Sequence, residues 1–176
     1  GIKCLSAFPV NARHRFQSVF LKKKGLKSKN VLPMLDSSWH TLTVIPGARP
    51  LRALADQLST LAPEGTRLRW ADELEERLSK RTDGLTTALS TLLANHAQID
   101  KLLLVVDQFE ELFTLCHDEN KRKLFVDNLL NACQKESIVV IITLRADFYA
   151  HCAQFDHLRT LLTKQQAYIG AMNYDE

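Results

Sequence analysis

Two stretches of consecutive apolar residues, each followed by charge, are the strongest hydrophobic signal along the chain. Residues 102–106 read LLLVV and are followed by Asp107, while residues 138–144 read IVVIITL and are followed by Arg145. Runs of this length, rich in β-branched residues, are typical of parallel strands that are covered on both faces. The charges then fall at the carboxyl ends of the strands, where open α/β sheets place their ligands.

The rest of the pattern alternates strands with amphipathic helices. A strand is predicted over residues 41–45, because Thr and Val are frequent there and Pro46-Gly47 is a turn signal that ends it. Apolar residues at helical spacing predict the helices, and two short apolar runs predict further strands. The predicted helices cover residues 50–61, 70–79, 85–93, 108–116, 118–134, 147–153 and 156–163, and the further strands cover 16–21 and 167–170. This alternation predicts an α/β fold with a parallel sheet.

Length and composition are those of one intracellular domain. The chain has 176 residues, 45% of them hydrophobic, which is enough for one core. No apolar run approaches the roughly 18 residues of a membrane-spanning helix, and the start lacks a secretory signal pattern. The four cysteines are spread singly without a C-x-x-C. We therefore expect a cytoplasmic protein without a membrane partner.

Charge divides the chain into two unequal parts. Residues 1–40 carry eight Lys or Arg and only Asp36, whereas residues 41–176 carry fifteen basic and nineteen acidic residues. A basic arm of this kind binds nucleic acid in some proteins. Here no aromatic interleaving or known binding module accompanies the lysines of residues 22–29, so a solvated segment is the favoured interpretation and a nucleic-acid partner is unlikely.

Four charged residues at the two strand ends have the chemistry of phosphoryl transfer. Asp107 is placed to hold Mg²⁺ through water, and Arg145 on the neighbouring strand is placed to reach a γ-phosphate. Glu110 and Glu111 follow Asp107 by about one helical turn, so one of them can face the same cleft while the other caps or pairs nearby. The structural alternative for Asp107 alone is a helix cap or an ion pair.

Other patterns point to chemistry less strongly. Cys116-His117 and His151-Cys152 both follow the apolar strands, and together they contain enough ligands for zinc. Within each pair the residues are adjacent rather than two to four apart, which places the two side chains on different faces of a helix, so core and surface roles are favoured. No G-x-S-x-G or S-x-x-K string supports nucleophilic catalysis.

Three longer strings of the chain are SWHTLTVIPGARPLRALADQL (residues 38–58), LLLVVDQFEELFTLC (102–116) and ITLRADFYAHC (142–152). Together they resemble the novel STAND NTPase 1 family, a mostly bacterial branch of signal-transducing P-loop ATPases that often precedes WD or other repeats, and the resemblance covers about residues 32–176. It implies a three-layer P-loop NTPase-like (ASCE) sheet with helices on both faces. It also implies ATP and Mg²⁺ as cofactors, slow hydrolysis as a conformational switch, and regulated oligomerisation. By this resemblance Asp107 matches the Walker B aspartate, Glu110 and Glu111 the acidic extension linked to hydrolysis, and Arg145 the sensor 1 arginine.

The chain departs from the family at the phosphate-binding loop. No G-x-x-x-x-G-K-[ST] string is present, and the corresponding place, residues 22–31, holds KKKGLKSKNV with a single glycine. We therefore divide the chain into a basic N-terminal segment, 1–31, and a partial STAND-type domain, 32–176, with the Walker A strand possibly lacking. In the family's sheet that strand lies between the sensor 1 strand and the last core strand, so either residues 16–21 fill the gap or an apolar seam is left for association.

Two functions follow from these observations. The first is an ATP-binding regulatory switch domain of a bacterial STAND signalling NTPase, incomplete or degenerate at the phosphate-binding loop, with protein partners bound through adjacent repeat domains. The second is a catalytically inactive interaction or scaffold module derived from such a domain. Whether the chain is an enzyme stays open at this point, because the family is an ATPase family and the Walker A string is absent.

Overall fold

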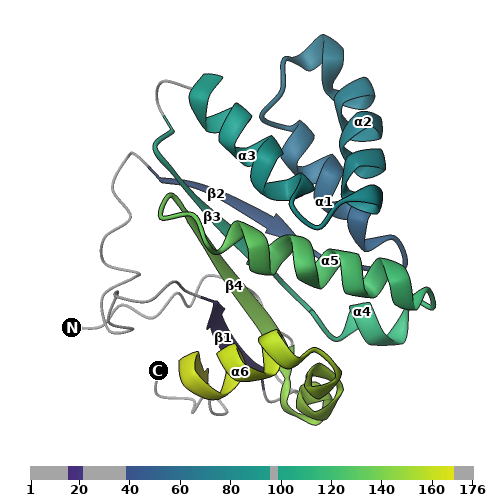
Figure 1. Ribbon diagram of the computed structural model, residues 1–176, viewed down its shortest axis with the longest axis vertical. Helices are drawn as coiled ribbons and strands as arrows, with labels where there is room; N and C mark the ends of the chain where they lie inside the picture. The colour runs from purple at the N-terminus through teal and green to yellow at the C-terminus, as the bar shows by residue number, and fades with distance from the viewer. Residues whose placement is uncertain (1–15, 22–38, 96–98, 169–176) are drawn as a thin grey trace, which may run out of the picture.

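A computed structural model of the chain describes residues 16–21, 39–95 and 99–168, and its centre is a five-stranded sheet (Figure 1). The strand order across the sheet is β2-β3-β4-β1-β5. The strands are β1 (Phe16–Leu21), β2 (Trp39–Val44), β3 (Lys101–Val106), β4 (Ile138–Arg145) and β5 (Gln166–Tyr168). All five correspond to predicted strands, with ends that differ by a few residues.

The three strands β2, β3 and β4 form a parallel sheet. Val44 lies opposite Val106, and Val106 lies opposite Ile142, so the three carboxyl ends meet at one edge. This edge, which carries Asp107 and Arg145, is called the carboxyl edge below. The predicted α/β fold with a parallel sheet is confirmed.

The apolar strands bury side chains on both faces of this sheet. One face belongs to the main core, in which alternate strand residues such as Leu104, Val106 and Val140 pack with the helices. The opposite face carries a smaller buried cluster of Leu103, Val105, Val139 and Ile141. Among the described residues, the partly buried apolar side chain that packs on this second cluster is Trp39, whose ring also lies 5.4 Å from the Lys101 ammonium. Burial on both faces explains why β3 and β4 read as continuous apolar runs rather than as alternating ones.

The strand β1 fills the position between β4 and β5 where the family resemblance places the Walker A strand. It runs antiparallel to β4, with Phe16 opposite Arg145 and Leu21 opposite Val140, and antiparallel to β5 as well. The predicted gap is therefore filled by residues 16–21. Because β1 is reversed, its carboxyl end lies at the edge of the sheet opposite the carboxyl edge, about 17 Å away along the strand.

Six α-helices and two short 3₁₀ segments connect the described strands, and α1, α2, α3 and α5 lie together over one side of the parallel strands (Figure 1). Each of α1, α2, α3, α5 and α6 corresponds to a predicted helix. None of the helices in the described ranges is long and apolar enough to cross a membrane. The helices are α1 (Pro50–Ser59), α2 (Arg67–Lys80), α3 (Gly84–Asn95), α4 (Glu111–Thr114), α5 (Glu119–Ala132) and α6 (Asp156–Gln165), with 3₁₀ segments η2 (Glu64–Thr66) and η3 (Ala146–Gln154).

Local sequence signals account for several helix ends. Pro50 stands in the first turn of α1, where a missing N–H costs nothing. The Asp118 side chain caps α5 by accepting a hydrogen bond from the Lys121 N–H at 3.1 Å. Gly84 begins α3 against the end of α2, and a Cβ there would lie 3.1 Å from the Arg77 carbonyl oxygen, so the close approach of the two helices favours glycine.

The predicted helix over residues 108–116 is shorter in the structure. Gln108 has φ 51°, in the left-handed region, and the Phe109 N–H still donates to the Thr143 carbonyl of β4 at 3.0 Å. The chain is therefore held to the sheet as far as Phe109, and regular helix α4 covers only Glu111–Thr114. The expectation that the helix begins at Gln108 was wrong, because backbone bonding to β4 outweighs local helical spacing.

Candidate functional site

Asp107 stands at the carboxyl edge, held by the end of β4. Its Oδ1 accepts hydrogen bonds from the Thr143 hydroxyl and from the Gln108 N–H, the latter at 3.0 Å. The Gln108 N–H also donates to the Thr143 Oγ1 at 3.0 Å. Among the described residues no hydrogen bond reaches the second oxygen, Oδ2. Asp107 is thus oriented by one oxygen while its other oxygen is left for a further contact.

Glu110 lies between Asp107 and Arg145 and is 8% exposed. Its Oε2 accepts a hydrogen bond of 3.4 Å from the Arg145 backbone N–H. Burial raises the pKa of Glu110 above its ordinary value, and the Asp107 charge adds to this rise, whereas hydrogen bonds from the backbone and the Arg145 charge oppose it. A carboxyl group with a raised pKa beside a second carboxylate is suited to accept and release a proton.

Glu111 faces a different neighbour from Glu110. It is the first residue of α4, and one of its carboxylate oxygens lies 4.0 Å from the place where a Cβ on Gly47 would stand. Gly47 has φ 57° and turns the chain after β2. The two adjacent glutamates therefore separate: Glu110 contacts the end of β4, and Glu111 lies against the loop that follows β2.

The Arg145 side chain pairs with an acid of its own segment. Its Nε donates to Asp147 Oδ1 at 3.2 Å and its terminal nitrogen donates to Asp147 Oδ2 at 2.8 Å. The guanidinium carbon also lies 5.7 Å from the centre of the Phe148 ring. The Arg145 side chain is 32% exposed, so this pair is partly solvated and contributes only about 0–1 kcal/mol. An anionic ligand can therefore compete with Asp147 for the guanidinium at small cost.

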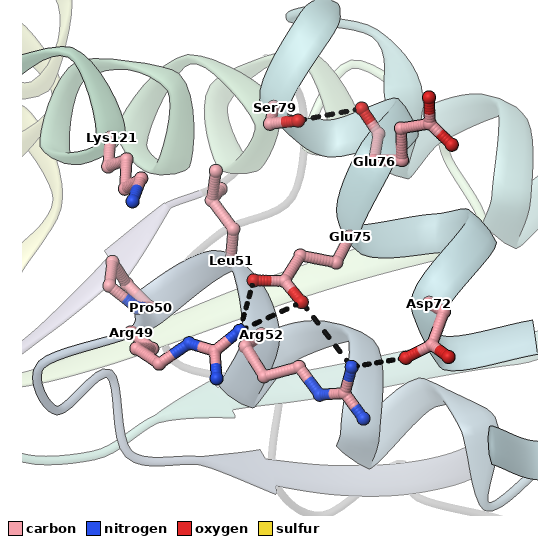
Figure 2. Close-up of a pocket in the computed structure, with 9 residues that line it drawn as sticks. All are labelled: Arg49, Pro50, Leu51, Arg52, Asp72, Glu75, Glu76, Ser79 and Lys121. Carbon is pink, nitrogen blue, oxygen red and sulfur yellow. Dashed lines mark hydrogen bonds and ion pairs between the residues drawn. The ribbon is translucent and has the colours of Figure 1, made fainter.

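A charged groove of about 370 Å³ lies beside the start of α1, bounded by α2 and by Lys121 of α5 (Figure 2). Its basic side chains are already paired. Arg49 donates to both oxygens of Glu75 at 3.0 and 3.3 Å, and Arg52 pairs with Asp72 and Glu75 (Figure 2). Asp107, Glu110 and Arg145 do not line this groove. We interpret it as an ion-pair network that holds α1 against α2 rather than as an anion site.

The other candidate metal ligands of the sequence do not form a metal-binding cluster among the described residues. Within the described ranges there is no group of three or more His, Cys, Asp or Glu side chains that could hold a metal ion. Cys116 is buried, with its Sγ 3.7 Å from the Asp118 carbonyl oxygen, and the His151 ring packs between Phe113 and Phe148. In both pairs the cysteine is buried and the histidine is exposed. Mg²⁺ needs fewer protein ligands, because it is commonly bound by one or two carboxylates with water and substrate phosphate, and Asp107 with an available oxygen fits that requirement.

The comparisons with known proteins give the family. Comparison with protein-family models matched residues 26–176 to the family described as novel STAND NTPase 1. The chain belongs to this family. Neither the curated proteins nor the solved structures gave a match. The match starts at residue 26, within the segment assigned above as basic and N-terminal.

Membership of the STAND NTPase family accounts for both the fold and the carboxyl edge. It does not account for the phosphate-binding loop. The family places that loop directly after the Walker A strand, at the edge that carries the acids. In this chain β1 ends at Leu21, at the opposite edge, and residues 22–38, which include Lys27 and Ser28, lie outside the described residues. The described residues therefore fit the metal side of a nucleotide site and do not supply its phosphate cradle.

Sequence reasoning named Asp107, Glu110, Glu111 and Arg145 and missed Thr143 and Asp147. Thr143 is β-branched and stands in an apolar strand, so it read as a strand former rather than as a partner of Asp107. The available signal was its position two residues before Arg145, which puts both residues on the same face of β4. Asp147 stands two residues after Arg145, and this spacing was likewise an available signal that Asp147 pairs with the guanidinium.

Proposed function

We propose that this STAND NTPase domain is a nucleotide-dependent switch whose nucleotide-binding edge carries Asp107, Glu110 and Arg145, with Asp107 as the metal ligand. The observation that supports it is their convergence from two adjacent parallel strands, with a buried Glu110 of raised pKa between the other two. A purely structural site rarely buries one carboxyl group beside a second carboxylate, because burial and the neighbouring charge both disfavour the ionised form of the buried group. Signalling, regulated oligomerisation, repeat-domain partners and a cytoplasmic location are part of the same proposal.

Each residue has a separate task in this proposal. Asp107 would hold Mg²⁺ through water, and the bound metal would neutralise phosphate charge during phosphoryl transfer. Glu110 would take the proton of the attacking water on a carboxylate oxygen. Arg145 would exchange its pair with Asp147 for the developing phosphate charge, while Glu111 would support the loop at Gly47. Because no phosphate cradle is provided by the described residues, we expect nucleotide affinity to be weak.

Isothermal titration of Mg·ATP into the full chain tests this function. We expect saturable binding that falls at least tenfold, about 1.4 kcal/mol, in Asp107→Asn, because the amide cannot replace the charge at the metal. Asp127→Asn is the matched control, since Asp127 pairs with Lys123 on the exposed side of α5 and should leave affinity unchanged. Absence of binding by folded wild-type chain, or equal affinity in Asp107→Asn, would reject the proposed switch.

A second function, an inactive interaction module derived from the family, is favoured by the direction of β1. A reversed strand leaves the carboxyl edge without the loop that normally follows it, and nucleotide binding is then lost while the sheet stays complete. For such a module, folding of the hydrophobic core does not depend on bound nucleotide. Titration of Mg·ATP separates the two functions, because only the switch binds it.

Engineered cysteines check the strand direction itself. Phe20 lies opposite Ile141 in the antiparallel register, so Phe20→Cys with Ile141→Cys is expected to form a disulfide on mild oxidation. Gln17→Cys with Ile141→Cys is the matched control, because residue 17 approaches residue 141 only if β1 runs parallel to β4. Free thiols counted by mass spectrometry report both pairs. Preferential linkage of the control pair would show the parallel arrangement and remove the observation that favours the inactive module.

A further inference from the structure

Thr143 makes three contacts with three consecutive residues at the carboxyl edge. Its hydroxyl donates to Asp107 Oδ1, the same hydroxyl oxygen accepts the Gln108 N–H at 3.0 Å, and its carbonyl accepts the Phe109 N–H at 3.0 Å. These bonds cross from β4 to the segment that leaves β3. The side chain and the backbone carbonyl of Thr143 therefore determine where the chain turns after β3 and how the Asp107 carboxylate is oriented.

The backbone of Gln108 supports this arrangement at an energetic cost. A non-glycine residue with positive φ is uncommon, and such conformations persist where the surrounding structure holds them. At Gln108 the φ of 51° accompanies an N–H bonded to both Asp107 Oδ1 and Thr143 Oγ1. The Thr143 hydroxyl is thus the common partner of the strained residue and of the carboxylate.

The position of Thr143 in β4 does not require a hydroxyl for packing. The preceding residues of the strand, from Ile138 to Ile142, are apolar and buried, and valine has nearly the shape of threonine. A hydroxyl in β4 can bond to Asp107 only at the carboxyl end of the strand, where Thr143 stands. Because the hydroxyl engages Oδ1 alone, it leaves Oδ2 available for a ligand.

We propose that Thr143 is a positioning residue for a divalent cation: its hydroxyl holds one oxygen of Asp107 so that the other is presented to the metal. This inference rests on the proposed switch function and adds a specific residue to it. Partners that orient a metal ligand typically change metal affinity by about 10–100-fold when they are removed. The hydroxyl, rather than the shape of the side chain, is the group that matters.

The test is titration of Mn²⁺ into the full chain in the presence of a non-hydrolysable ATP analogue, with free Mn²⁺ measured by electron paramagnetic resonance. We expect Thr143→Val to weaken Mn²⁺ binding about tenfold or more, while Thr143→Ser, which keeps the hydroxyl, stays close to wild type. Thr86→Val is the matched control, because the buried Thr86 hydroxyl has no hydrogen-bond partner among the described residues and Thr86 belongs to α3 rather than to the carboxyl edge. Thermal unfolding of each variant shows that it is folded.

The outcomes separate the inference from the function on which it rests. Saturable Mn²⁺ binding that is equal in wild type and Thr143→Val would overturn the role of Thr143 and leave the switch in place. Equal loss in Thr143→Ser and Thr143→Val would also overturn it, since a hydroxyl would then not be sufficient. Absence of Mn²⁺ binding by folded wild-type chain would overturn both.

Discussion

Replacing Asn128 with alanine is expected to lower the free energy of unfolding by about 3 kcal/mol, because several buried polar groups lose their partner at once. Asn128 is fully buried in α5. Its Oδ1 accepts the Leu85 N–H at 2.9 Å, and its Nδ2 donates to the carbonyls of Arg81 and Leu124 at 2.9 Å and of Leu78 at 3.3 Å. One side chain thereby ties α5 to the turn between α2 and α3.

Differential scanning calorimetry measures the effect. For a chain of this size we expect the midpoint of unfolding to fall by roughly 6–12 °C. Asn131→Ala is the matched control: Asn131 lies one turn further along α5, and its amide donates to the Thr82 carbonyl at an exposed position, at 2.8 Å. We expect a change below about 1 kcal/mol for the control. Equal midpoints for the two variants would show that the buried network does not hold the helical layer together.

The core of the fold could be predicted because its signals are local. The apolar runs of β3 and β4, the turn at Pro46-Gly47 and the Asp118 cap each depend on a few neighbouring residues, and the structure has each of them. Asn128 could not be predicted in the same way. Its partners lie up to 50 residues away, so nothing near it in the sequence identifies it as a buried connector.

The direction of β1 also depends on distant residues. A six-residue strand has the same pattern whichever way it runs, and its orientation is decided by pairing with β4 and β5, more than 100 residues later in the chain. The candidate site contains both features that follow from local sequence and features that are decided by distant residues. Asp107 and Arg145 follow from the rule that charges after buried parallel strands meet at one edge, and helical spacing also predicts that one of Glu110 and Glu111 faces the same cleft. That it is Glu110 is decided by its contact with the Arg145 N–H, 35 residues away in the sequence.

Replacing Glu110 with glutamine is expected to reduce the rate of ATP hydrolysis by about 10²–10⁴-fold if Glu110 accepts the proton of the attacking water. Mg·ATP affinity should change little, because Asp107 rather than Glu110 is assigned to the metal. Glu111→Gln is the matched control, since its carboxylate lies toward Gly47 and away from the end of β4. A steady-state phosphate-release assay, paired with calorimetric titration, separates turnover from binding. Equal rates in the two variants would contradict the assignment of the proton acceptor to Glu110.

The same substitution has a consequence for stability that does not depend on nucleotide. Because burial raises the pKa of Glu110 above its ordinary value of 4.5, the folded chain binds this proton more tightly than the unfolded chain does. The stability contributed by the group is therefore fully present below pH 4.5 and is lost as the pH rises through the raised pKa. Glutamine carries no charge at any pH, so Glu110→Gln should gain stability relative to wild type between acidic and neutral pH, as measured by urea unfolding. A constant difference across that range would mean that Glu110 is not buried as a carboxyl group, and the argument for its role in proton transfer would fail with it.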